Sequence, residues 1–66
     1  MTAQVGKLLD AIGHQTLSLR ELMEKMGLQH RQSFRITYLL PALEAGVIEM
    51  TLPEKPNSSK QKYRVK

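Results

Sequence analysis

Ser18–Leu28, SLRELMEKMGL, is the stretch that decides the fold, because both ends of a short helix are marked in it. Ser18 and Glu21 have the spacing of a capping box, in which the hydroxyl accepts a first-turn N–H and the carboxylate accepts the serine N–H. Leu22 belongs to an apolar stripe at helical spacing, and Gly27 stands where a left-handed residue commonly ends a helix. A capped two-turn helix closed by glycine and an apolar residue is typical of the first half of a helix-turn-helix.

A second helix is predicted upstream of this stretch. Its apolar positions recur at spacings of three and four, and they are Val5, Leu8, Leu9 and Ile12. Gly13 is well placed to end it. The connection that follows is short, and we expect extended backbone at Thr16 and Leu17.

A third helix is expected downstream, from Arg31 or Gln32, with a weak start because His30 is not a favoured capping residue. Phe34 and Tyr38 lie on its apolar face. Pro41 cannot donate a hydrogen bond and disfavours helical geometry at the residue before it. We therefore expect a kink or a restart at Pro41, followed by a short last helix that ends at Gly46.

The apolar period changes to two after Gly46, which indicates strands with one buried face. The first expected strand buries Ile48, Met50 and Leu52, and the second buries Gln61, Tyr63 and Val65. Between them, residues 53–59 are rich in turn-forming types. The fold class predicted is α+β, a small winged helix-turn-helix with three helices followed by a β-hairpin wing. Its core is expected to centre on Leu8, Leu22, Phe34, Leu43 and Ile48.

Length and composition limit the chain to one domain, residues 1–66, with no cysteine to form a disulfide or a thiolate metal site. No signal peptide and no run of about 20 apolar residues are recognised, so we expect a soluble cytoplasmic domain. The net charge is +4, and the excess of basic residues lies from His30 onward.

Catalytic chemistry is not indicated by any motif. His14 and His30 have no partner at metal-ligand spacing, Ser18 is explained as a helix cap, and the four glycines form no phosphate-binding loop. We therefore expect no enzymatic activity, no cofactor, no metal and no membrane contact for this chain.

Double-stranded DNA is the first partner that the basic half suggests. In a helix-turn-helix the start of the second helix faces base edges, and flanking basic groups hold phosphates. The residues expected there are His30, Arg31, Gln32 and Arg35 on the third helix, Lys55 and Lys60 at the wing tip, and Lys62 and Arg64 on the outer strand face. The alternative is that these side chains are solvated charges on a small domain.

A protein contact is the second interpretation. Ile36 and Leu40 are expected on the outer face of the third helix, one turn apart, where they would form a small apolar ridge. A kink at Pro41 could instead turn Leu40 inward and leave Ile36 alone.

A resemblance to a bacterial family is carried by Pro41–Pro53, PALEAGVIEMTLP, and by the Gln61–Arg64 ending, QKYR. Together with Glu21–Met23 and Gly27–Leu28, they resemble the C-terminal winged-helix domain of Fic-like proteins and of related ATP-binding transcriptional regulators. The resemblance implies a C-terminal piece of a larger protein.

The resemblance also limits what this chain does. The Fic signature, His-Pro-Phe followed by a Gly-Asn-Gly-Arg loop, does not occur in it, so adenylyl transfer would reside elsewhere in the parent protein. Ile36, Thr37 and Leu40 stand where relatives tend to carry basic residues. The resulting expectation is a non-catalytic accessory domain that contacts DNA. The alternative is a docking or self-association module that positions the parent's catalytic domain.

Overall fold

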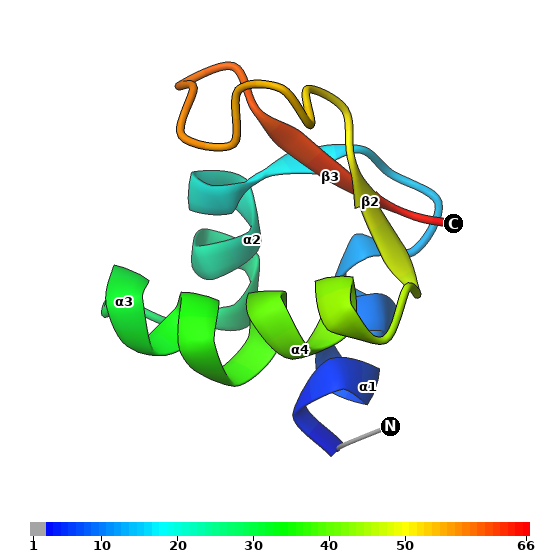
Figure 1. The fold of residues 1–66 in the computed structure, drawn as a ribbon. Coiled ribbons are helices and arrows are strands. Elements are labelled where there is room, and N and C mark those ends of the chain that lie inside the picture. Colours follow the sequence, from blue (N-terminus) through cyan, green and yellow to red (C-terminus); the bar gives the residue numbers. More distant parts are fainter. Residues whose placement is uncertain (1–2) are drawn as a thin grey trace.

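Three helical segments pack against a small antiparallel sheet in the computed structural model, which describes residues 3–66 (Figure 1). The third segment has three consecutive parts. In chain order the elements are α1 (Ala3–Ile12), β1 (Leu17–Ser18), α2 (Leu19–Met26), α3 (Arg31–Phe34), the π-helical turn η1 (Arg35–Leu39), α4 (Leu40–Glu44), β2 (Ile48–Met50) and β3 (Lys62–Val65). The predicted winged helix-turn-helix is confirmed.

Both ends of α2 form as the sequence predicts. The Glu21 N–H donates to the Ser18 hydroxyl at 3.1 Å, and the Ser18 N–H donates to the Glu21 carboxylate at 2.9 Å. Gly27 closes the helix with φ of 70°, and the Leu28 N–H reaches back to the Met23 carbonyl at 2.9 Å. These are the bonds of a Schellman end, which requires the left-handed conformation that glycine adopts most easily.

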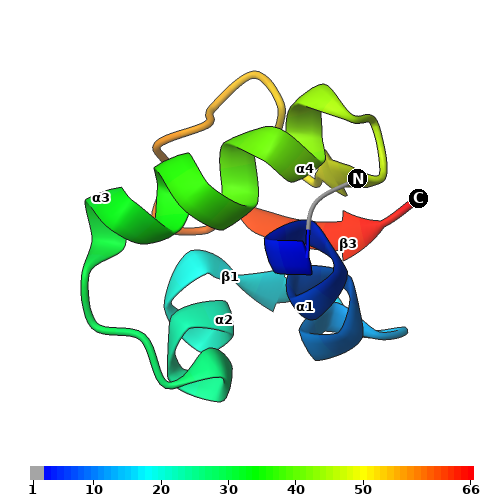
Figure 2. The ribbon, with the colours of Figure 1, turned by 90° about the horizontal axis from the view of Figure 1, so that it is seen from below.

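The expected kink or restart at Pro41 is replaced by the π-helical turn η1 just before it. The Leu40 N–H donates to the Arg35 carbonyl five residues back, and Leu40 keeps helical φ and ψ of −60° and −45°. Pro41 has no N–H and its ring crowds the carbonyl four residues earlier, and a widened turn just before it relieves both problems. The helix from Arg31 to Glu44 therefore runs through without a restart, as Figure 2 shows.

The sheet has the order β1-β3-β2, so β3 is the central strand. Tyr63 pairs with Leu17 on one side and with Met50 on the other. The strands are shorter than predicted, since β2 ends at Met50, and both Leu52 and Val65 are exposed. Leu52 follows the end of β2, and Val65 is the last residue of β3.

The core joins one face of every helical segment to the sheet. Four of the five predicted core residues are buried, whereas Leu43 is only partly buried and packs at the edge of the core. The extra residue in η1 rotates the apolar face, so Leu39 and Ala42 follow Phe34 into the core. The buried residues are Val5, Leu8, Ile12, Leu22, Met23, Phe34, Leu39, Ala42, Ile48, Gln61 and Tyr63.

Within residues 3–66, none of the helices has the length and apolar character that crossing a bilayer requires.

Candidate nucleic-acid interface

The predicted contact residues of the third helix gather at its N-terminal end. His30, Arg31 and Gln32 are exposed, and Arg35 is half-buried. No side chain caps this helix at His30, as the weak start predicts. Arg31, Gln32 and Arg35 border a shallow surface hollow together with Ile36 and Leu40. The structure thus places the predicted DNA residues and the predicted protein-contact residues side by side.

Ile36 and Leu40 are 59% and 41% exposed. Because the helix continues through η1 with helical geometry at Leu40, Pro41 does not turn this side chain inward. We call this pair the apolar ridge. It lies outside the buried face of the third helix, to which Phe34 and Leu39 belong.

The wing is the loop between β2 and β3, and in Figure 1 it lies over the start of α2. Lys55 and Lys60 are exposed on it. Arg35 Nη1 donates to Asn57 Oδ1 at 3.5 Å, which connects the helix to the wing. Two of the cation-bearing elements predicted from the sequence are therefore adjacent in space.

The two basic residues of β3 have acidic neighbours. Arg64 Nε donates to the carboxylate of Glu49, its cross-strand partner, in an ion pair. Lys62 lies close enough to Glu21 for its charge to help lower the pKa of that carboxyl, although the hydrogen bonds from Ser18 lower it more. Within the described part of the chain, Arg31, Arg35, Lys55 and Lys60 have no such ion pair. Phosphate contacts are thus easier for these four cations than for Arg64.

A pocket of about 440 Å³ opens between α2, the third helix and the wing. We call it the helix–wing pocket. It is lined by Ser18, Leu19, Arg20, Arg31, Arg35, Pro56, Asn57, Ser58, Ser59, Gln61 and Tyr63. Three arginines and no carboxylate are in this set, so the pocket is electropositive.

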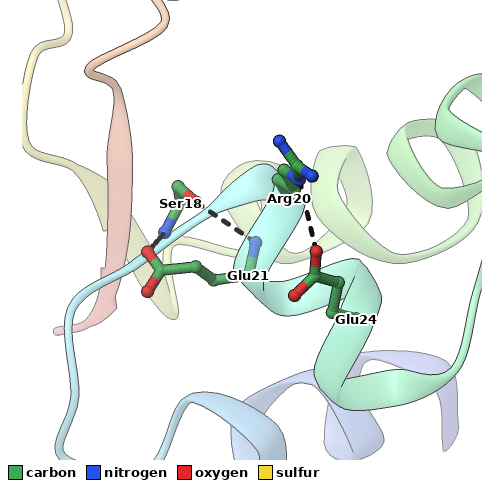
Figure 3. Close-up of polar contacts among 4 residues, drawn as sticks. All are labelled: Ser18, Arg20, Glu21 and Glu24. Atoms are coloured by element: carbon green, nitrogen blue, oxygen red, sulfur yellow. Dashed lines mark hydrogen bonds and ion pairs between the residues drawn. The ribbon is translucent and has the colours of Figure 1, made fainter.

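Arg20 is a site residue that the sequence analysis missed. It follows Ser18 in the first turn of α2, where its Nε donates to Glu24 Oε1 at 3.2 Å (Figure 3). Both side chains are largely exposed, so this i, i+4 pair is weak and the two Nη groups remain for other partners. In the sequence, Arg20 is marked only by its position directly before the capping residue Glu21. Its position beside the wing is known only from the fold.

Tyr63 is the second missed residue. Burial raises the pKa of its hydroxyl, and the nearby Arg35 charge opposes this effect only in part. The phenol is therefore protonated at neutral pH and is a hydrogen-bond donor. His14 and His30 are exposed, and within residues 3–66 no group of three or more His, Cys, Asp or Glu side chains could hold a metal ion.

Comparison with known proteins places this arrangement in context. The family "Filamentation induced by cAMP protein Fic-like, C-terminal domain" matches residues 3–66. The crystal structure of a Fic family protein from Desulfovibrio desulfuricans G20 is 47% identical to the chain, with a TM-score of 0.93. The match covers 100% of this chain and 20% of that one, so the chain spans about a fifth of that protein's length. A search of curated proteins finds no match.

Proposed function

The chain belongs to the family of C-terminal domains of Fic-like proteins, and we propose that it is a non-catalytic domain that contacts duplex DNA. Family and fold do not fix function by themselves, because winged helices also serve as protein docking modules. The proposal therefore rests on the surface of this chain. Catalysis by the parent protein, which we propose to be adenylyl transfer, would be carried out by a segment outside this chain.

The observation that supports DNA contact is the electropositive helix–wing pocket and its surroundings. Arg31 and Arg35 come from the first turns of the third helix, and the wing is hydrogen bonded to Arg35 through Asn57. Lys55 and Lys60 extend the positive surface along the wing. In a winged helix, a positive helix start beside a positive wing suits a major groove and the phosphates that flank it.

Base readout would be limited to the start of the third helix. Arg31 and Gln32 are exposed there, and these side chains can bond guanine and adenine edges in bidentate fashion. Ile36, Thr37 and Leu40 follow, and none of them carries a charge. We therefore propose binding that is mostly electrostatic and weakly selective for sequence.

Titration of a labelled random duplex, followed by fluorescence anisotropy at several salt concentrations, tests this function. Four phosphate contacts by Arg31, Arg35, Lys55 and Lys60 would give a log–log salt slope of about −3 to −4. Arg35→Gln should lower the slope by about one. Arg64→Gln also removes one positive charge, but Arg64 is already paired with Glu49, so this variant should change the salt slope much less. Absence of binding up to about 100 μM at low salt would overturn the proposal.

The apolar ridge supports a second candidate function, which is docking or self-association that positions the parent's catalytic domain. Ile36 and Leu40 are flanked by Arg31 at one end of the same helix and by Glu44 at the other. Two copies of this helix packed antiparallel about a dyad would place Ile36 of one copy against Leu40 of the other. The same arrangement brings Arg31 of one copy near Glu44 of the other, so the face is self-complementary.

Burial of both aliphatic side chains contributes about 3–6 kcal/mol before association costs, so this contact would be weak. Sedimentation at increasing concentration of the Ile36→Lys, Leu40→Lys double variant tests it, with Leu52→Lys as the control at an exposed apolar residue of the wing. Loss of self-association in the double variant alone would support docking. A monomeric parent sequence, with tighter DNA binding by the double variant, would leave DNA contact as the only function of this face.

A further inference from the structure

Tyr63 presents a donor that the protein itself does not use. The residue is 4% exposed, and its hydroxyl has no hydrogen-bond partner among residues 3–66. Every fully buried side-chain nitrogen or oxygen in the described chain does have a partner, so this hydroxyl must still be reached by solvent. Since Tyr63 lines the helix–wing pocket, the pocket is the route.

The Tyr63 ring is buried while its hydroxyl still reaches the pocket without a protein partner, so this hydroxyl can donate to a ligand there. The Arg35 charge acts on this hydroxyl, so the guanidinium and the phenol lie near the same space. The pocket floor therefore offers a neutral donor beside a permanent positive charge. An acceptor with negative charge would satisfy both.

The pocket walls select for the same kind of ligand. Arg31 and Arg20 line it with Arg35, and Ser58 and Ser59 of the wing add hydroxyl groups. Arg35 is held towards the wing only by a long hydrogen bond to Asn57, and Arg20 uses only its Nε on Glu24, so most guanidinium donors remain for a ligand. Guanidinium groups match the geometry of phosphate oxygens better than any other side chain.

We propose that the helix–wing pocket binds one phosphate group, with Arg31 and Arg35 as its ionic partners and the Tyr63 hydroxyl as a donor from the floor. The proposal deepens the proposed function, since a backbone phosphate of duplex DNA would be one source of this group. Free inorganic phosphate presents the same oxygens. Tyr63 would thereby fix one phosphate relative to the central strand of the sheet, and so set how the third helix enters a groove.

The test is a titration of the ¹⁵N-labelled chain with inorganic phosphate at constant ionic strength, followed by NMR. Wild-type chain should show saturable shifts centred on Tyr63, Ser58 and the arginine Nε groups. Tyr63→Phe keeps the packed ring and removes the donor, and we expect it to weaken phosphate binding about tenfold. Tyr38→Phe is the matched control, because Tyr38 stacks on Phe34 with ring centroids 5.4 Å apart and does not line the pocket.

Arg35→Gln provides an independent variant and should abolish saturable binding of phosphate. Equal phosphate affinity of Tyr63→Phe and wild type, or shifts spread evenly over all basic residues, would overturn the pocket. The same variants titrated with a short duplex separate the two proposals. Salt-dependent duplex binding that Tyr63→Phe leaves intact keeps the DNA function and overturns the pocket. Phosphate binding that depends on Tyr63, without duplex binding, keeps the pocket and overturns the DNA function.

Discussion

The side-chain amide of Gln61 hydrogen bonds with both backbone groups of Leu52 at the base of the wing. The Leu52 N–H donates to Oε1 at 2.8 Å, and Nε2 donates to the Leu52 carbonyl. Nε2 also donates to the Lys55 carbonyl at 3.0 Å. Gln61 is 4% exposed. β2 ends at Met50, so Leu52 lies beyond the paired strand, and the Gln61 side-chain amide makes the hydrogen bonds to Leu52 that a neighbouring strand would otherwise make.

Substitution of Gln61 should loosen the wing. Gln61→Leu removes three hydrogen bonds and leaves partly buried backbone groups of Leu52 and Lys55 without their partner, and we expect a loss of about 1–3 kcal/mol in the free energy of unfolding. Hydrogen exchange at the Leu52 amide should accelerate in parallel. Gln29→Leu, at an exposed position before the third helix, is the control. A Gln61→Leu variant as stable as wild type, with slow exchange at Leu52, would contradict this role.

Local signals in the sequence predict much of this fold. The capping box at Ser18, the glycine ends and the change of apolar period after Gly46 each depend on neighbours within a few residues, so they can be recognised without the structure. The sequence predicts Gln61 on the buried face of the second strand; it is buried, but it lies just before β3, which begins at Lys62. Its role could not be predicted, because its partners Leu52 and Lys55 become known only when the wing is closed.

Glycine substitutions should separate two backbone requirements. Gly6 lies within α1 with open space where a Cβ would stand, so Gly6→Ala should stabilise the chain by about 0.5–1 kcal/mol. Gly27 has equal space but φ of 70°, so Gly27→Ala should destabilise it by about 1–2 kcal/mol. Urea unfolding measures both effects. An unchanged or higher midpoint for Gly27→Ala would mean that the left-handed end of α2 is not needed, and a lower midpoint for Gly6→Ala would contradict the open space at that position.

The sequence did not predict which side chains of the third helix form its buried face beyond Phe34. A regular helix carries the apolar face from Phe34 through Tyr38 to Ala42, whereas η1 carries it through Leu39. The effect of Pro41 on its own turn was expected, but whether the chain kinks or widens depends on packing against α1. The candidate site, too, could be predicted only in part from the sequence. Arg31 and Arg35 could be recognised as helix-start cations, whereas Arg20 and Tyr63 join them only through the fold.

The capping box should make stability depend on pH in the acidic range. Hydrogen bonds from Ser18 lower the pKa of the Glu21 carboxyl in the folded chain. Because the pKa of Glu21 is lower in the folded chain than in the unfolded chain, ionised Glu21 stabilises the fold. This contribution is complete above the unfolded-state pKa and is lost as the pH falls through the folded-state pKa. Ser18→Ala should cost about 0.5–2 kcal/mol at neutral pH, and less in acid. Urea unfolding of Ser18→Ala and wild type from neutral to acidic pH measures this. A cost that is constant over that range would contradict the coupling.

Phe34 should contribute more to stability than any exposed residue of the third helix. Its side chain is fully buried and stacks on Tyr38, with an interplanar angle of 20°. Phe34→Ala should cost about 3–5 kcal/mol, because it removes a large apolar surface and leaves a cavity. A chain of 66 residues has a total stability of roughly 3–10 kcal/mol, so this variant should lose between about a third of that stability and all of it. Phe34→Leu, which fills most of the volume, should retain the fold at a smaller cost.

Circular dichroism during urea unfolding measures both variants, with Leu52→Ala as the exposed control. If Phe34→Ala unfolds at the same urea concentration as Leu52→Ala, then Phe34 is not part of the cooperative core and the assignment of the buried face is wrong.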